Sequence, residues 1–318
     1  MKANILMKKI SPNPKNSCSD YFNDWLEVML TPNCNGTCSW CVEKKGYHPE
    51  NKDSLDKLYE VILSTKKKNV ILLGGEPTLY PNIKELIDLL SQAGKNVYLT
   101  TNGSLLKNDF YKNLTNLSGL NVSIHHFDLY KNQEIVGINI DKKDLYLTFS
   151  KLKNHNVKIR LNCNLIDSYI DSEEVLYKYI DFAKSLNVDS IRFAELKNCD
   201  GSFISLGKIL DYEYGLNEDP FTKGCWKHAN INGMEISFRQ MCGFQTSLRP
   251  KPKNPQWPKQ SKNVVYYDGT IYNNWQKGKD HLIDNKKLKD KLDVIFDNMK
   301  NNSISNEEAK KIIKKFIK

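Results

Sequence analysis

The sequence predicts an α/β fold built on a parallel sheet. Between residues 25 and 196, six short apolar runs alternate with five segments in which apolar residues recur at helical spacing. Strands that alternate in this way with helices of roughly 10–15 residues form right-handed βαβ units, whose strands run parallel. The periodicity alone does not distinguish a barrel from an open, doubly wound sheet.

The expected strands cover residues 25–30, 70–73, 97–100, 120–124, 157–161 and 190–196. The expected helices cover residues 55–65, 81–93, 105–114, 142–153 and 171–186. Helix ends support three of these helices. Asp53 or Ser54 caps the first, Gly94 follows the second, and an acidic turn that starts at Asp171 opens the last. The link before residue 142 has no clear pattern.

After residue 198 the pattern changes to short alternating runs and a helical tail. Residues 234–238 and 264–272 alternate, and Asp268-Gly269 favours a tight hairpin turn. The tail, residues 280–318, has helical periodicity and a capping box that starts at Ser305. We therefore expect an irregular lead-in (1–24), a core (25–198) and a C-terminal extension of a β-hairpin followed by helices (199–318).

The composition is that of an ordinary soluble protein, with 40% hydrophobic and 26% charged residues among 318. No run approaches the ~18–20 apolar residues of a membrane span, and the N-terminal apolar stretch is too short for a signal peptide. We expect a cytoplasmic protein without a membrane partner. The net charge of +10 suits a nucleotide, a phosphorylated substrate, nucleic acid or an acidic peptide. It equally fits solvated lysines, because no block of consecutive basic residues occurs.

Three of the eight cysteines lie close together after the first expected strand. Cys34, Cys38 and Cys41 fall within residues 31–41, TPNCNGTCSWC. In a chain without a secretion signal they favour metal binding over disulfides. A structural zinc site needs four closed ligands, whereas three thiolates on a [4Fe-4S] cluster leave one iron open. A zinc knuckle completed by His48 is the alternative.

A second motif, Gly74-Gly75-Glu76-Pro77, follows the second expected strand. Glycines let a backbone approach a ligand closely, the glutamate offers an anion to an ammonium group, and the proline fixes the exit of the loop. A plain turn between a strand and a helix would also explain the motif taken alone. Because the motif follows the cysteines by one βαβ unit, the two motifs together are a far more specific signal than either motif alone.

The cysteine spacing CxxxCxxC, with Trp40 before the last cysteine, and the GGEP motif together resemble the radical S-adenosylmethionine (SAM) superfamily. The resemblance spans residues 25–196 and implies a partial (β/α)6 TIM-like barrel. It implies a [4Fe-4S] cluster on Cys34, Cys38 and Cys41, and SAM as second cofactor, its amino group held at the GGEP motif. It also implies a reducing partner such as flavodoxin or ferredoxin.

The resemblance further implies SAM-binding residues at the carboxyl ends of later strands. The candidates are Thr101, Asn102, Ser123, Asn162 and Phe193. Ser123 and His125 share one face of the fourth strand by alternation, and Asn162 shares a polar face of the fifth with its neighbours two residues away. Strand ends solvated at a rim would explain the same pattern. No catalytic residue beyond these binding groups is assigned.

The implied function is an enzyme that reductively cleaves SAM to a 5′-deoxyadenosyl radical, which abstracts hydrogen from a small-molecule or nucleotide-like substrate. One alternative is maturation of a ribosomally synthesised peptide, favoured by the similarity of the hairpin to a twitch or SPASM extension. Another is a non-catalytic metal-binding regulatory protein, against which Glu76 counts. Cys199, Cys225 and Cys242 lie where relatives hold auxiliary clusters, but no CxxC pair follows residue 200, so we expect a cluster-free extension.

Overall fold

The computed structural model describes residues 24–41, 54–196, 204–211, 226–240 and 263–272. The chain divides into two compact units. One comprises Met1–Lys44 and His48–Trp275, and the other comprises Lys45–Tyr47 and Gln276–Lys318. Every described residue belongs to the first unit, so the expected tail helices and most of the lead-in lie outside the described residues. Within the described part, no helix is both long and apolar enough to cross a membrane.

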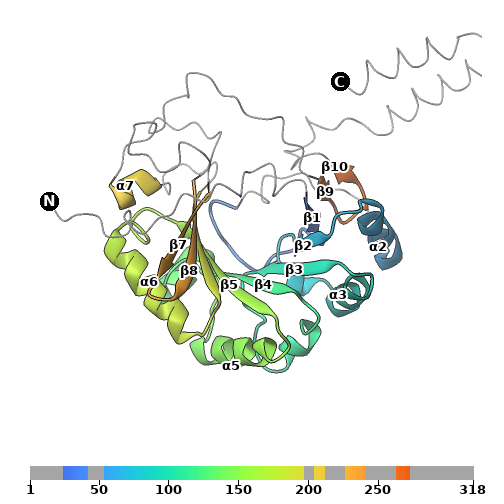
Figure 1. Cartoon of the computed structure of the whole chain (residues 1–318), viewed down its shortest axis with the longest axis horizontal. Coiled ribbons are helices and arrows are strands. Elements are labelled where there is room, and N and C mark those ends of the chain that lie inside the picture. Colours follow the sequence, from blue (N-terminus) through green and yellow to red (C-terminus); the bar gives the residue numbers. More distant parts are fainter. Residues whose placement is uncertain (1–23, 42–53, 197–203, 212–225, 241–262, 273–318) are drawn as a thin grey trace, which may run out of the picture. The chain divides into compact units, whose positions relative to one another are not determined.

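A single ten-stranded sheet organises the described unit, and its central six strands run parallel in chain order. These strands are β1 (Trp25–Met29), β2 (Asn69–Leu73), β3 (Asn96–Thr101), β4 (Gly119–Ser123), β5 (Lys158–Leu165) and β6 (Ser190–Glu195). The sheet curves into an arc whose outermost strands do not pair with each other (Figure 1). The predicted α/β class and partial barrel are thus confirmed.

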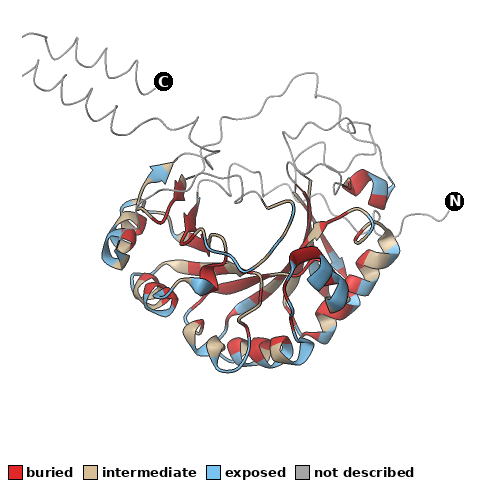
Figure 2. Cartoon of the chain, turned by 180° about the vertical axis from the view of Figure 1, so that it is seen from behind, coloured by how far each residue is buried: buried red, intermediate tan, exposed pale blue. Residues whose placement is uncertain are grey.

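Helices cover the convex side of the arc (Figure 1). The longer ones are α2 (Leu55–Ser64), α3 (Ile83–Gln92), α5 (Lys142–Lys153) and α6 (Glu173–Ser185). Their starts follow the capping signals, since Ser54 accepts a bond from the Lys57 amide and Ser172 one from the Val175 amide. The core lies between these helices and the strands, and Figure 2 shows buried residues concentrated there.

Two predictions between the third and fifth strands need correction. Residues 105–114 form turns and a short 3₁₀ helix, η4 (Phe110–Asn113), instead of an α-helix. Asn108 has a left-handed backbone (φ +52°), which interrupts the helical path. The link without a clear pattern contains a helix, α4 (Leu129–Val136), capped by Asp128 and ended by Gly137.

The extension adds strands to both edges of the barrel sheet. β7 (Trp226–Ile231) and β8 (Met234–Arg239) form an antiparallel hairpin, and β8 pairs in parallel with β6. β9 (Asn263–Val265) pairs in parallel with β1, and β10 (Ile271–Tyr272) returns antiparallel to it. The expected Asp268-Gly269 turn is present, with Gly269 at φ +74°. A short helix, α7 (Leu206–Leu210), precedes these strands.

Candidate active site

The cysteine loop leaves the carboxyl end of β1. Cys34 is exposed, Cys38 and Cys41 are half-buried, and all three are free thiols. The Gly36 amide donates to the Cys34 sulfur over 3.3 Å. Although the residue is exposed, the surrounding chain partly desolvates the Cys34 thiol, which raises its pKa above the usual value, and the nearby Glu76 carboxylate adds to this effect. Loading this thiol with metal therefore releases a proton.

Three alternate residues at the start of the loop form hydrogen bonds to neighbouring segments. The carbonyl of Thr31 accepts from the Gly75 amide and that of Asn33 from the Glu76 amide, each over 2.7 Å. The Asn35 side chain accepts from Asn102 over 2.8 Å and donates to the Ser104 hydroxyl over 2.9 Å. The loop is thereby fixed to the ends of both β2 and β3.

The glycines of the GGEP motif pack against this loop. A Cβ on Gly75 would lie 2.3 Å from the Asn33 carbonyl oxygen, and one on Gly74 would lie 2.6 Å from the Thr31 carbonyl oxygen. The two glycines therefore allow a close approach between two backbone segments of the chain itself. It brings the cysteine loop beside Glu76.

We expect Gly75→Ala to damage the site although it adds only one methyl group, because that methyl group would clash with rigid backbone and not with a side chain. Iron bound after anaerobic reconstitution should fall to less than about half of wild type, with a loss of about 2–3 kcal/mol in unfolding free energy. Gly233→Ala is the control for iron loading, because a Cβ there meets nothing within 4 Å, although its left-handed backbone (φ +84°) means that it also loses stability. Full iron loading of Gly75→Ala would contradict the expectation.

Glu76 links the loops that follow β2 and β3. It is 1% exposed. Its Oε1 accepts from the Thr78 amide over 3.0 Å, from the Thr78 hydroxyl, and from the Thr101 hydroxyl over 2.6 Å. Its Oε2 accepts from the Asn102 amide over 2.7 Å, which leaves this oxygen an acceptor position. Pro77, the last residue of the motif, is buried at the start of the 3₁₀ helix η3 (Pro77–Leu79).

A polar pocket of about 170 Å³ lies at the carboxyl ends of β4, β5, β6 and β8. Its lining residues are Ser123, His125, Asn162, Cys163, Asn164, Arg192, Ala194 and Arg239. Ser123, Asn162 and Arg192 are register partners across three neighbouring strands. The Nε atoms of Arg160 and Arg192 both donate to Asn162 Oδ1, over 3.1 and 3.2 Å. The structure thus brings Ser123 and Asn162 together.

Phe193 does not reach this pocket. It is fully buried on the other face of β6, edge-on to Tyr179 of α6 with ring centroids 5.3 Å apart, and stacked on Phe238. The reason is the alternation of side chains along a strand, which places Arg192 and Ala194 on the pocket face. Phe193 is therefore a core residue in this fold.

Four residues of this region were not among the predicted site residues. Arg239 and Trp226 pair across the β7–β8 hairpin, and the guanidinium carbon of Arg239 lies 5.1 Å from the Trp226 ring centroid. The Arg192 guanidinium carbon lies 5.4 Å from the same centroid. His125 is buried, and this burial lowers its pKa to about 4, so that its ring is neutral at physiological pH. Its Nδ1 accepts from the Asn164 amide over 3.0 Å.

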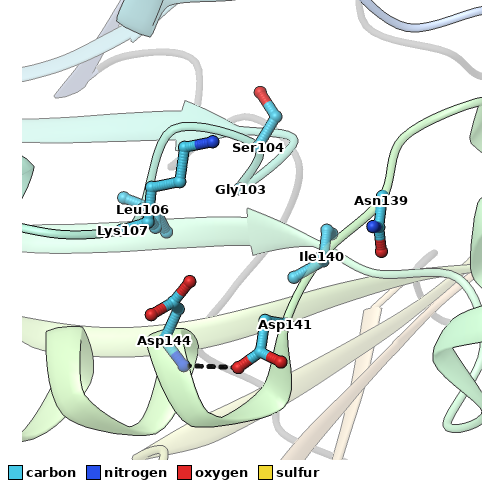
Figure 3. A pocket seen from close by; sticks show the side chains of 8 residues that line it. All are labelled: Gly103, Ser104, Leu106, Lys107, Asn139, Ile140, Asp141 and Asp144. Carbon is cyan, nitrogen blue, oxygen red and sulfur yellow. Dashed lines mark hydrogen bonds between the residues drawn. The ribbon is translucent and has the colours of Figure 1, made fainter.

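A second pocket, of about 140 Å³, adjoins the loop after β3. Figure 3 shows its walls, with Ser104 and Lys107 from that loop and Asp141 and Asp144 from the start of α5. The Asp141 carboxylate caps α5 by accepting from the Lys143 and Asp144 amides. Because the Asp141 carboxylate of this second pocket already caps α5, we place the candidate site at the polar pocket beside β4, β5, β6 and β8, together with the cysteine loop.

The donor set suits an iron–sulfur cluster. Among the described residues, no three His, Cys, Asp or Glu side chains lie close enough together to hold a single metal ion. On a cubane cluster each thiolate binds a different iron, so three separated sulfurs on one loop fit that group. Glu76, within electrostatic range of Cys34, fits the ammonium group of a ligand on the remaining iron. His48 lies outside the described residues.

Comparison with known proteins agrees with this reading of the residues. Residues 28–180 match the family model described as the radical SAM superfamily. A probable GTP 3′,8-cyclase of Sulfolobus acidocaldarius is 27% identical over 237 residues, which are 73% of this chain and 68% of that protein. The GTP 3′,8-cyclase of Aquifex aeolicus is 25% identical over 258 residues, or 78% of this chain and 72% of the relative.

The fold is also found among solved structures. Streptococcus suis SuiB superposes with a TM-score of 0.54 at 17% identity, over 79% of this chain and 60% of SuiB. At this identity the likeness concerns the fold alone. The family model ends before β6, so that Arg192, Trp226 and Arg239 lie outside the matched residues.

Proposed function

We propose that this chain, whose residues 28–180 match the radical SAM family model, is a radical SAM enzyme that acts on a phosphorylated nucleotide, bound next to SAM at the carboxyl end of the barrel. Enzymes of this family use a [4Fe-4S] cluster and SAM, and they need a reductant. When bound, these cofactors supply a carbon-centred radical that abstracts hydrogen from the substrate.

In this proposal the chain's own residues bind and orient the reactants. Cys34, Cys38 and Cys41 hold the cluster, and Glu76 accepts hydrogen bonds from the amino group of SAM at its Oε2. Ser123 and Asn162 contribute polar contacts to SAM from the ends of β4 and β5. Correct placement is the main task of the protein, because the radical reacts with whichever hydrogen lies closest.

The observation that carries the nucleotide part is the pair of guanidinium groups in the polar pocket. Arg192 and Arg239 both line it, and each lies against the Trp226 ring. Guanidinium groups bind phosphate with two parallel hydrogen bonds, and contact with an aromatic ring restricts the positions that they adopt. The named substrate of the cyclase relatives supports the same class of ligand.

We expect Arg239→Gln to weaken GTP binding about tenfold or more, the value of one charge-assisted contact. Guanosine, which lacks phosphates, should bind the variant and the wild type equally, and so should SAM. Lys143→Gln, which removes an equal charge from the exposed surface of α5, is the control and should leave GTP binding unchanged. Isothermal titration of each reconstituted protein with GTP, guanosine and SAM measures these affinities.

Two results would redirect the assignment. A loss of SAM affinity in Arg239→Gln, with GTP unaffected, would place the guanidinium at the SAM carboxylate. Absence of GTP-dependent 5′-deoxyadenosine formation in the wild type, combined with activity on a short precursor peptide, would favour the maturase function. Flavodoxin or ferredoxin is the proposed electron donor in either case.

A further inference from the structure

The turn that ends α4 contacts the middle of the cysteine loop. Gly137 terminates the helix with a left-handed backbone, φ +70°. A Cβ built on Gly137 would lie 2.1 Å from the Thr37 hydroxyl oxygen and 3.1 Å from the Thr37 Cβ. The side chain of Thr37 therefore occupies the space that any other residue at position 137 would need for its own Cβ.

Backbone contacts fix the same segment. The Thr37 amide donates to the Val136 carbonyl over 2.8 Å. A Cβ on Gly36 would lie 3.2 Å from Ile138 Cδ1 and 3.4 Å from the Val136 carbonyl oxygen. The two residues just before the second cysteine are thus held by three consecutive residues at the end of α4.

The segment that leads into α4 contacts the loop on the other side of Cys38. The His125 ring lies edge-on to Trp40, with centroids 5.5 Å apart and planes at 85°. Hydrogen bonds fix both the backbone and the ring of His125. The Asn132 side chain of α4 accepts from the His125 amide over 2.7 Å, and the His125 ring accepts from the Asn164 amide. The stretch from β4 to the end of α4 therefore supports the loop before and after its second cysteine.

We propose that the contact of Thr37 with Gly137 positions the cysteine loop, so that the sulfurs of Cys34 and Cys38 are held at the separation that the cluster requires. Thr37 and Gly137 are positioning residues, since neither supplies a ligand. A site whose ligands are fixed before binding loses less conformational entropy when it binds. The proposal depends on the cluster and not on the nucleotide substrate.

The test compares iron release from full-length reconstituted variants into a chelator under anaerobic conditions. Gly137→Ala should release iron about tenfold faster than the wild type, because the clash displaces the loop. Gly94→Ala is the matched control. Gly94 also has a left-handed backbone, φ +74°, but a Cβ there meets nothing within 4 Å, so its release rate should stay at the wild-type value.

A double variant separates the contact from backbone strain. Thr37→Ala alone should release iron moderately faster, because the loop loses its support, and it should fold normally because Thr37 is exposed. In Gly137→Ala with Thr37→Ala the clashing hydroxyl is gone and only the milder 3.1 Å contact between the two Cβ atoms remains, so the rate should fall from that of the single glycine variant toward that of Thr37→Ala. The g-values of the reduced cluster should shift in Gly137→Ala and return in the double variant.

Alkylation of the cysteines shows whether the fold survives. Cys163 is 1% exposed within the core and should stay unreactive in every variant, while Cys34 and Cys38 become reactive as iron leaves. The proposal is overturned if Gly137→Ala matches Gly94→Ala, or if Thr37→Ala matches the wild type. A double variant as fast as Gly137→Ala alone would overturn it equally. If Gly137→Ala unfolds, as Cys163 reactivity would show, the Thr37→Ala rate decides.

Discussion

Cys38→Ala is expected to remove the cluster and with it all 5′-deoxyadenosine formation. A [4Fe-4S] cluster that keeps only two of its three protein thiolates is not retained. Iron per chain should fall from about four, the content of one such cluster, to near zero. The measurement is iron counting after anaerobic reconstitution, followed by a SAM-cleavage assay.

Cys163→Ala is the matched control, because the same substitution falls on β5 in the hydrophobic core. It should keep its iron and lose about 1–2 kcal/mol of unfolding free energy. Loss of iron from this variant would contradict the assignment of the three ligands. About eight irons per wild-type chain, the content of two clusters, would show that Cys199, Cys225 and Cys242, outside the described residues, contribute a second one.

Glu76→Gln is expected to abolish high-affinity SAM binding and to destabilise the protein. Each oxygen of this carboxylate accepts a backbone amide, Oε1 from Thr78 and Oε2 from Asn102. The amide nitrogen of glutamine must replace one of these oxygens, so in either orientation it faces a backbone N–H that cannot turn away. We expect a loss of about 2–4 kcal/mol in unfolding free energy.

The same substitution at an exposed position separates the two effects. Glu85→Gln changes the first turn of α3 at the surface and should alter stability by less than about 0.5 kcal/mol, with SAM binding unchanged. SAM affinity is measured by titration at a temperature where Glu76→Gln is still folded. Wild-type SAM affinity in that folded variant would show that the amino group of SAM binds elsewhere.

The sequence predicted the central sheet well because its strands are short and rich in apolar residues. Val70, Ile71 and Leu72, for example, are consecutive and all buried, as expected for a parallel sheet covered on both faces. The α-helix expected at 105–114 does not form, because Asn108 has a left-handed backbone. The spacing of apolar residues, on which the expectation was based, does not reveal such a backbone. Helix α4 was missed because polar Asn132 lies in its buried stripe.

The site was predictable where chemistry is local and not where it depends on pairing between distant segments. Ser123 and Asn162, each expected on a polar face of its own strand, both line the polar pocket, but on β6 the pocket residue is Arg192 and the expected Phe193 lies on the buried face. The contribution of Arg239 could not be derived, because it depends on the pairing of β8 with β6. Likewise, no local pattern indicates that Gly75 packs against Asn33.

The two hairpins at the edges of the sheet have a consequence for how the protein is made. β9 hydrogen-bonds to β1, and β8 to β6, so each side of the parallel core is completed by a segment translated after it. While residues 197–263 are being translated, the nascent chain still presents the N–H and C=O groups of β1 that later bond to β9. Unpaired strand edges invite other chains to add to them. The period of greatest aggregation risk therefore falls late in synthesis, after every cofactor ligand we assign has already left the ribosome.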